Sequence, residues 1–292
     1  MNFEKVLNER IDFINEGLKT YLKPQYPEII YEAMGYSVFA GGKRLRPLLL
    51  LGACEACGGD IKEALPFACA IEIIHTYTLI HDDLPAMDND DYRRGKLACH
   101  KAFSEDIAIL AGDGLLNMGF EIMLEAAVKG NDTKFTRAAY TVGSLCGVKG
   151  TIGGQVVDLL SETKKADEKT LLYIHKAKTA ALIEAALKAG AIIGGADEET
   201  LNKLETAANK LGLAFQIKDD LLDITSTAEV LGKPIGSDDK NGKSTYISVF
   251  GLEKAQKDYL SLSEEANEIF ESLGEKGAFL AEYCRRLVDR IN

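Results

Sequence analysis

Three long stretches of this chain carry apolar residues three and four positions apart, the spacing that gathers side chains on one face of an α-helix. They cover residues 107–128, 171–193 and 201–224, and Ala, Leu, Glu, Lys and Ile are frequent in them. Only six prolines occur among the 292 residues. The alternating pattern of a β-strand is almost absent, with residues 246–250 as its best example. The sequence therefore predicts an all-α protein.

Short glycine-containing segments separate the predicted helices. They lie at residues 41–42, 58–60, 130–132, 153–154, 194–195 and 236–242. Connections this short place consecutive helices side by side in one bundle. The sequence has no low-complexity tract and no repeat of solenoid length. We therefore expect residues 1–292 to form a single domain.

The overall composition excludes several classes of protein. A net charge of −11 argues against a nucleic-acid-binding surface, because such a surface needs a positive field. Apolar runs are broken by Gly, Glu or Lys before they reach membrane-spanning length, so we expect no stable membrane insertion. The first ten residues lack the apolar core of a secretory signal, which predicts a cytoplasmic protein. Cys54 and Cys57 form the only paired cysteine spacing, and buried thiols are favoured over a zinc or redox site.

A first acidic motif ends a helix that is predicted to begin near residue 66. It places five carboxylates within ten residues: Asp82, Asp83, Asp88, Asp90 and Asp91. The C-terminal end of a helix carries partial negative charge, so clustered carboxylates there are unfavourable until cations neutralise them. Hard divalent cations with oxygen ligands meet this need.

A second acidic motif lies inside a strongly helical segment. Gln216, Asp219, Asp220 and Asp223 follow i, i+3, i+4 and i+7 spacing, so they share one stripe of the helix. Apolar residues cover much of the remaining surface, which predicts a buried helix that carries carboxylates into a cavity. Either motif alone fits a solvated acidic face or a polar loop equally well. Together they indicate Mg²⁺ that bridges a polyphosphate.

Basic side chains that could bind a diphosphate occur in discrete clusters. They are Lys43 with Arg46, Arg93 with Arg94, Lys178 beside Thr179, and the single residues Lys233 and Lys243. Arginine offers a bidentate fork to phosphate oxygens and lysine a point charge, although a single lysine is more often a surface residue. His75 stands two helical turns before Asp82 on the same face. We therefore interpret His75 as a ligand contact rather than a core histidine.

Five motifs, in this order, resemble those of the bacterial-type short-chain trans-prenyl diphosphate synthases, most closely the farnesyl diphosphate synthases. They are GGKRLRP, IHTYTLIHDDLPAMDNDDYRRG, HKAKTAAL, LAFQIKDDLLD and LGKPIGSDDKNGKSTY. The resemblance implies an isoprenoid-synthase-type helical bundle around a deep central cavity, Mg²⁺ as cofactor, and a homodimer. It also implies that isopentenyl diphosphate is condensed with dimethylallyl or geranyl diphosphate to give (2E,6E)-farnesyl diphosphate.

The resemblance also implies a role for each motif residue. Asp82, Asp88 and Asp219 would hold Mg²⁺ on the allylic diphosphate, with Asp83, Asp220 and Asp223 as accessory ligands. The allylic substrate would contact Arg93, Lys178, Thr179, Gln216, Lys233 and also Lys243. Isopentenyl diphosphate would be held by Lys43, Arg46, His75 and Arg94.

The expected chemistry is ionisation, condensation and elimination. Mg²⁺ and the basic side chains neutralise the leaving diphosphate, so that the allylic C–O bond ionises to a delocalised cation in a water-poor cavity. The double bond of isopentenyl diphosphate then attacks this cation, and a proton is lost. We expect the departed diphosphate to take that proton, because the motifs offer no neutral histidine beside the site.

Product length is predicted from Tyr77 and Thr78, five and four residues before Asp82. These side chains lie deeper along the helix than the metal motif, where a growing chain must pass, and an aromatic ring there blocks elongation. The alternative is that Tyr77 only packs in the core. Other products within the family, geranyl or geranylgeranyl diphosphate, remain open.

Two functions outside this reaction are disfavoured. A terpene cyclase would not need a second set of basic residues for a second diphosphate. A regulatory subunit would have lost acidic ligands, whereas both acidic motifs are complete here.

Overall fold

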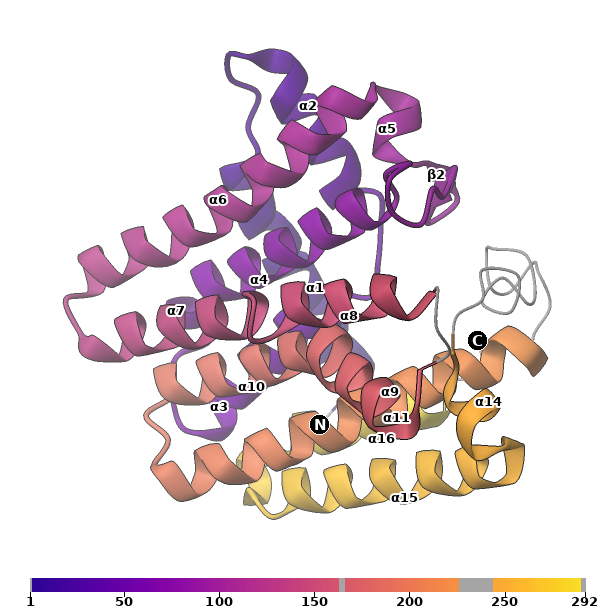
Figure 1. The fold of residues 1–292 in the computed structure, drawn as a ribbon. Coiled ribbons are helices and arrows are strands. Elements are labelled where there is room, and N and C mark those ends of the chain that lie inside the picture. Colours follow the sequence, from indigo (N-terminus) through magenta and orange to yellow (C-terminus); the bar gives the residue numbers. More distant parts are fainter. Residues whose placement is uncertain (1, 163–165, 226–243, 290–292) are drawn as a thin grey trace.

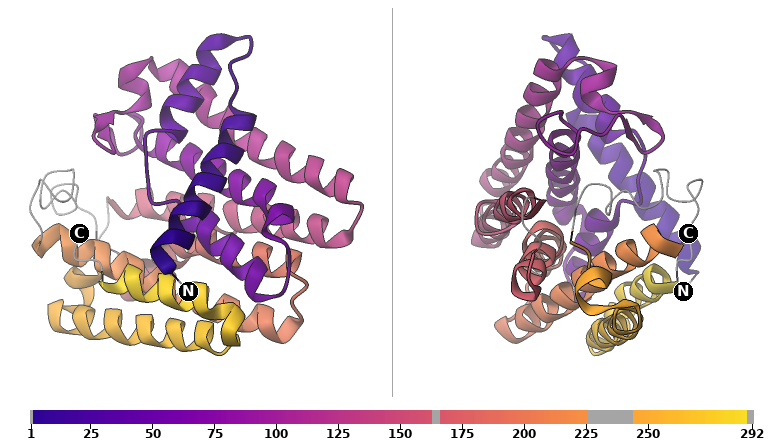
Figure 2. Two further views of the ribbon diagram at one scale, coloured as in Figure 1. Left: turned by 180° about the vertical axis from the view of Figure 1, so that it is seen from behind. Right: turned by 45° about the vertical axis from the view of Figure 1, so that its right-hand side comes forward.

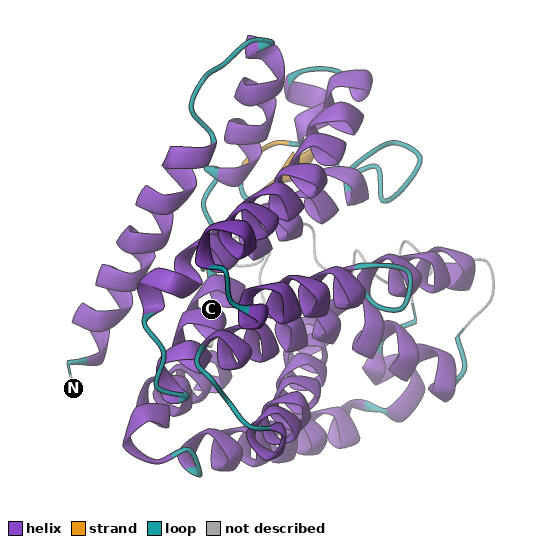
Figure 3. Cartoon of the chain, turned by 90° about the vertical axis from the view of Figure 1, so that its left-hand side faces the viewer, coloured by secondary structure: helices purple, strands orange, loops and turns teal. Residues whose placement is uncertain are grey.

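A computed structural model of the chain describes residues 2–162, 166–225 and 244–289, and these residues are almost entirely helical (Figures 1 and 3). The helices are α1 (Phe3–Tyr21), α2 (Glu28–Val38), α3 (Leu45–Ala56), α4 (Ile61–Asp82), α5 (Cys99–Ala102), α6 (Glu105–Gly130), α7 (Thr133–Cys146), α8 (Thr151–Glu162), α9 (Glu168–Ile174), the π-helix η1 (His175–Ala180), α10 (Ala181–Ile193), α11 (Glu198–Thr225), α14 (Tyr246–Phe250), α15 (Leu252–Glu271), the 3₁₀ helix η2 (Gly274–Gly277) and α16 (Ala278–Asp289). A small antiparallel hairpin joins β1 (Tyr92–Arg93) to β2 (Lys96–Leu97). The prediction of an all-α protein is confirmed.

Several predicted boundaries were wrong, each for a local reason. Residues 246–250, the most strand-like pattern in the sequence, form helix α14, in which Thr245 and Ser248 cap the first turn reciprocally. Helix α4 begins at Ile61 instead of near residue 66. The Asp60 side chain caps this start by accepting a hydrogen bond from the backbone N–H of Lys62. The predicted break at 153–154 falls inside α8, and the actual break lies just before that helix. The predicted break at 236–242 lies outside the described residues.

Helix α4 lies at the centre of the bundle and carries the first acidic motif at its C-terminal end. It packs along α6 and α3, while α10 joins α3 to α7 and α11, and α15 covers α11 (Figure 1). The core at this junction includes Leu48 to Leu51 of α3 and Phe67, Ile71 and Ile74 of α4, all fully buried. Each such side chain contributes about 1.5–3 kcal/mol of transfer free energy, so the elements that carry the acidic motifs are firmly held.

The two ends of the described chain meet. Phe3 of α1 stacks on Phe279 of α16 with ring centroids 5.4 Å apart, and Glu4 forms an ion pair with Arg286. The start of α1 therefore packs against α16, and α1 then runs away from that helix (Figure 2).

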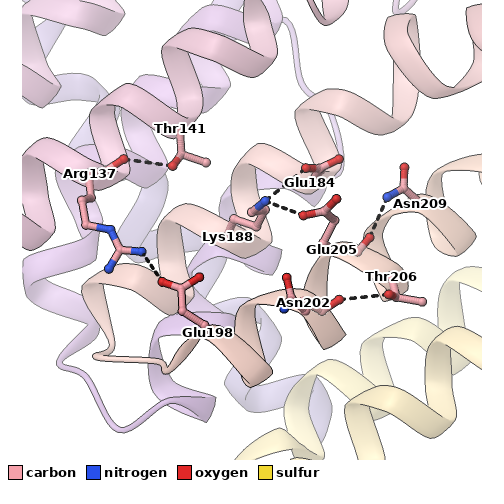
Figure 4. A network of polar contacts seen from close by, with 9 residues as sticks. All are labelled: Arg137, Thr141, Glu184, Lys188, Glu198, Asn202, Glu205, Thr206 and Asn209. Carbon is pink, nitrogen blue, oxygen red and sulfur yellow. Dashed lines mark hydrogen bonds and ion pairs between the residues drawn. The ribbon is translucent and has the colours of Figure 1, made fainter.

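Ion pairs fix the N-terminal half of α11 to its neighbours. Arg137 of α7 contacts Glu198 at 2.8 Å, and Lys188 of α10 contacts Glu205 at 2.6 Å (Figure 4). Such partly exposed pairs are each worth about 1 kcal/mol or less, so they set orientation more than stability. The second acidic motif lies about three to five turns further along the same helix.

Two described helices, α4 and α6, are long and apolar enough to cross a membrane by length and composition alone. The expectation from the sequence had been that no apolar run reaches that length. Core helices of helical bundles meet the same criteria. Here α4 is the central helix of the core, which accounts for its apolar character, while α6 packs along it on one face only.

Candidate active site

A cavity of about 500 Å³ opens between α3, α4, α6, α8, the π-helix η1 and α11. Nine of the residues singled out from the sequence line it: Arg46, His75, Tyr77, Thr78, Asp82, Lys178, Thr179, Gln216 and Asp219. They come from four separate elements of the chain. The fold therefore brings the two acidic motifs and two of the basic clusters to one cavity.

Asp82 lies at the polar end of this cavity, where α4 ends. The loop that follows folds back, and the backbone N–H of Asp88 donates to the carbonyl of Asp82 at 2.8 Å. Burial, together with the negative charges of Asp88 and Asp83, raises the pKa of Asp82 to about 6, against the opposing effect of Lys178. This carboxylate is therefore in a position that favours a bound cation.

Asp83 and Arg93 pair with each other instead of facing the cavity. The Arg93 side chain donates through Nε to Asp83 Oδ1 at 2.9 Å and through Nη2 to Asp90 at 3.3 Å. Arg93 lines a neighbouring cavity of about 20 Å³ with Arg94. The described structure thus does not bring Arg93 to the main cavity, where contact with an allylic substrate was predicted.

The second motif divides between the cavity and the bundle. Gln216 and Asp219 line the cavity. Asp220 is buried and accepts hydrogen bonds from the backbone N–H of Tyr246 at 2.6 Å and from Gln216 Nε2 at 3.4 Å. Asp223 is also buried. Asp220 therefore fastens α11 to the start of α14, a role that the stripe pattern alone did not indicate.

The donor set fits a cation that needs few protein ligands. Within residues 2–162, 166–225 and 244–289, no three His, Cys, Asp or Glu side chains form a group that could hold a metal ion by themselves. Asp82 and Asp219 nevertheless face the same cavity from two helices. Mg²⁺ keeps several waters and is commonly bound by one or two carboxylates plus phosphate oxygens, so these residues fit Mg²⁺ in the presence of a diphosphate.

Lys178 and Thr179 lie in the π-helix η1, a widened turn that often occurs at functional sites. Lys178 donates to Asp158 of α8 at 2.6 Å, and Thr179 Oγ1 donates to Gln216 Oε1 at 3.0 Å. Gly154 permits this packing, because a Cβ atom there would come within 2.3 Å of the backbone nitrogen of Lys178. A glycine inside α8 thus seats η1 directly against that helix.

His75 and Arg46 form the basic part of the cavity wall. Desolvation and the positive charges of Arg46 and Arg94 hold the pKa of His75 well below its usual value, so this histidine is neutral. The expectation that no neutral histidine lies beside the site was therefore wrong. Burial also lowers the pKa of Arg46 to about 10. His75 Nδ1 and Arg46 Nε are buried, and no described residue hydrogen-bonds to either atom.

The other predicted basic residues lie beside this wall or outside the described chain. Helix α3 begins at Leu45, so Lys43 precedes the helix that carries Arg46. Lys43 lines a smaller cavity together with Asp219. Arg94 donates to the carbonyl of Gly41. Lys233 and Lys243 lie outside the described residues.

Much of the cavity wall is apolar. Its lining includes Met87, Leu116, Ile152, Val156, Leu159, Leu182 and Phe215. Tyr77 is only 6% exposed and packs edge-on against His81, with ring centroids 5.8 Å apart. Thr78 Oγ1 donates to the carbonyl of His75 at 2.7 Å. A cavity lined both by charged groups and by these apolar side chains suits a diphosphate with a hydrocarbon tail.

Sequence reasoning missed two polar residues of α8. Asp158 pairs with Lys178, and Gln155 lines the cavity. No described residue hydrogen-bonds to either amide atom of Gln155. The available signal was a pair of polar residues three apart in an otherwise apolar helix, which places both on one face.

Comparison with known proteins identifies close relatives along the whole chain. The model of the family described as Polyprenyl synthetase matches residues 27–281. The farnesyl diphosphate synthase of Geobacillus stearothermophilus is 42% identical over 296 aligned residues, which cover 99% of this chain and 98% of that protein. The geranylgeranyl diphosphate synthase of Cyanophora paradoxa is 44% identical over 292 residues, covering 100% of this chain and 97% of that protein. The solved structure of geranyltransferase from Helicobacter pylori, complexed with magnesium and isoprenyl diphosphate, has a TM-score of 0.85 and 31% identity, covering 99% of this chain and 97% of that one.

Proposed function

Since this chain belongs to the polyprenyl synthetase family, we propose that it condenses isopentenyl diphosphate with dimethylallyl or geranyl diphosphate to give (2E,6E)-farnesyl diphosphate. One observation carries the proposal: Asp82 and Asp219 line the same cavity as Lys178 and a set of apolar side chains. Purified protein with both substrates and Mg²⁺ should release an alcohol of farnesyl length after the product is dephosphorylated. Absence of any prenyl product would refute the proposal.

Asp82, Asp88 and Asp219 would hold Mg²⁺ with the diphosphate oxygens, and the ion would supply positive charge to the leaving group. Two observations support the magnesium requirement: the raised pKa of Asp82 and the magnesium named in the Helicobacter pylori complex. Asp83, Asp220 and Asp223 are assigned to supporting positions, since Asp83 pairs with Arg93 and Asp220 binds the start of α14.

The chain's own residues would orient and protect the reacting groups. Lys178 contributes positive charge to the allylic diphosphate, with Asp158 fixing its ammonium group. Thr179 and Gln216 form one hydrogen-bonded pair on the cavity wall. When the C–O bond ionises, the apolar lining excludes water from the cation, and the double bond of isopentenyl diphosphate attacks it. Arg46 and His75 hold that second substrate.

The final proton goes to the departed diphosphate in this proposal. His75 is neutral, but the pKa that keeps it neutral also makes it a weak base. Its Nδ1 atom is free of partners among the described residues and suits a hydrogen bond to substrate. Although the structure contains a neutral histidine, the assignment of the base is therefore retained.

A geranylgeranyl product is the second candidate, favoured by the name of the Cyanophora paradoxa relative. The farnesyl assignment is preferred because Tyr77 lies along the cavity wall beyond the carboxylates. Terpene cyclisation is disfavoured by the separate basic group around Arg46. A purely regulatory role is disfavoured by the two complete acidic motifs.

We also propose that residues 1–292 act as a single cytoplasmic domain that forms a homodimer. Apolar side chains from α1 to α16 share one main core, which supports the single domain. Large apolar side chains are exposed on and between α6, α7 and α8, among them Leu124, Val128, Tyr140, Val148 and Leu160. Such a surface suits a second copy of the chain. A monomeric mass in light scattering at micromolar concentration would contradict this assignment.

A further inference from the structure

Arg44 is a basic residue of the first basic motif that sequence reasoning assigned to no substrate. It is 5% exposed and lies just before α3 with a left-handed φ of 49°. Its guanidinium donates to Asn15 Oδ1 at 3.0 Å, to Glu72 Oε1 at 2.8 Å and to the carbonyl of Val38 at 2.9 Å. Glu72 is itself only 2% exposed. One side chain thus joins helices α1, α2, α3 and α4.

Stability alone does not account for this arrangement. Burying an ion pair costs desolvation that often equals the attraction gained. A non-glycine residue in the left-handed region adds a further conformational cost. An apolar pair would serve the core equally well, so the arrangement points to a requirement for geometry at this position.

The residues beside Arg44 are those expected to bind isopentenyl diphosphate. Lys43 precedes it and Arg46 follows two residues later. Gly41 and Gly42 have φ values of 102° and 121°, so the chain enters this segment in a conformation set by glycine. The position of both basic side chains therefore depends on how the segment from Gly41 to Arg44 is held.

Arg94 is held by the same segment. Its Nη1 atom donates to the carbonyl of Gly41, and a Cβ atom on Gly42 would lie 2.7 Å from its guanidinium carbon. His75 stands three residues after Glu72, on the same face of α4. The Arg44–Glu72 pair thus lies next to all four residues assigned to the second substrate.

The charges agree with this placement. Glu72 favours the charged forms of both Arg46 and Arg94, while the arginines oppose one another. One buried carboxylate therefore offsets part of the repulsion within a group of cations.

We propose that the Arg44–Glu72 ion pair is a positioning device that fixes the Gly41–Gly42 segment, and through it Lys43, Arg46 and Arg94, as a preformed site for isopentenyl diphosphate. The inference rests on the proposed function, because it names the residues that set up one of its two substrate sites. Neither Arg44 nor Glu72 is required to touch the substrate.

The test is the variant Glu72→Gln in the full chain, with Km measured separately for isopentenyl diphosphate and for the allylic diphosphate. Loss of positioning should raise the Km for isopentenyl diphosphate by roughly tenfold to a hundredfold, with the allylic Km and the kcat at saturation changed by less than about threefold. Asn15→Ala removes only one of the Arg44 hydrogen bonds and should give a smaller rise in the same Km. If Glu72→Gln does not fold, the Km of Asn15→Ala for isopentenyl diphosphate tests the inference instead, and an unchanged value would overturn it.

A matched control is Glu55→Gln. Glu55 lies at the C-terminal end of α3 and pairs with Arg10 of α1, another buried arginine. This variant should lower thermal stability without shifting either Km. If Glu72 were only a counter-charge, its removal would make the net charge around Arg46 and Arg94 more positive and would tighten binding of the anionic substrate. Unchanged or tighter binding of isopentenyl diphosphate by folded Glu72→Gln, or equal rises in both Km values, would overturn the inference. Absence of both turnover and calorimetric binding of isopentenyl diphosphate in the unmodified protein would instead refute the proposed function.

Discussion

Replacing Tyr77 with Ala should lengthen the product. Tyr77 is five residues before Asp82, which places it about 7.5 Å further along the axis of α4 at 1.5 Å per residue. Its ring lines the cavity and is fixed edge-on by His81. Removal of the ring opens the path of the growing chain, so products should shift from fifteen carbons to twenty or more, with the need for Mg²⁺ unchanged.

The same substitution has a cost in stability that can be separated from its effect on the product. Truncation of a buried aromatic residue costs about 3–5 kcal/mol, against a typical free energy of unfolding of about 5–15 kcal/mol. The variant should therefore fold with a lower melting temperature. Phe67→Ala removes a fully buried ring from the same helix, away from the cavity lining, and serves as the matched control. It should be destabilised to a similar degree and still make the original product.

Chain length is assayed by dephosphorylating the products and separating the prenols by chromatography. Tyr77→Phe keeps the ring and should keep the product, since the proposed effect is steric. A folded and active Tyr77→Ala enzyme that stops at the same length as the unmodified protein would refute this reasoning. A shift in Phe67→Ala as well would show that loosening of the bundle, rather than Tyr77, sets the length.

Three further predictions follow from individual contacts. Asp158→Asn should weaken the contact that positions Lys178. The loss, about 1.5–3 kcal/mol, should lower kcat/Km for the allylic substrate roughly tenfold to a hundredfold in steady-state kinetics. An unchanged value would contradict the positioning of Lys178. Lys43→Ala should raise the Km for isopentenyl diphosphate more than the allylic Km, whereas equal changes would remove Lys43 from that substrate's site. Burial lowers the pKa of His175 to about 4. As the pH falls, the histidine of the unfolded chain therefore becomes protonated near pH 6.5, whereas that of the folded chain becomes protonated only near pH 4. The free energy of unfolding should therefore fall by about 3 kcal/mol as the pH drops through this window. Thermal denaturation at pH 7 and pH 5 should show a smaller drop in stability for His175→Gln than for the unmodified protein.

The helices could be predicted from the sequence because their apolar periodicity extends over many turns. Residues 107–128 and 201–224 fall within α6 and α11. The region 171–193 was predicted as helical, but the π-helix inside it was not. This π-helix spans only six residues, too few for its wider turn to alter the apolar spacing recognisably.

The site was predictable where a residue acts alone on a helix face, and less so where pairing decides its position. Asp82, His75 and Asp219 reach the cavity as their spacing indicated. Arg93 does not, because the buried Asp83 carboxylate binds it. Arg44 and Glu72 are 28 residues apart in the sequence, and nothing local to either indicates that the fold brings them together.

The central claim is that one cavity binds a diphosphate through Asp82 and Asp219 and directs prenyl transfer. The most direct measurement follows the conversion of isopentenyl diphosphate and geranyl diphosphate with Mg²⁺, with excess EDTA, and in the Asp82→Ala and Asp219→Ala variants, with circular dichroism to verify helix content. The account predicts farnesyl diphosphate from the unmodified protein with Mg²⁺, and losses of at least about a hundredfold with EDTA or in either folded variant. Full turnover in excess EDTA, or in both variants, would contradict it.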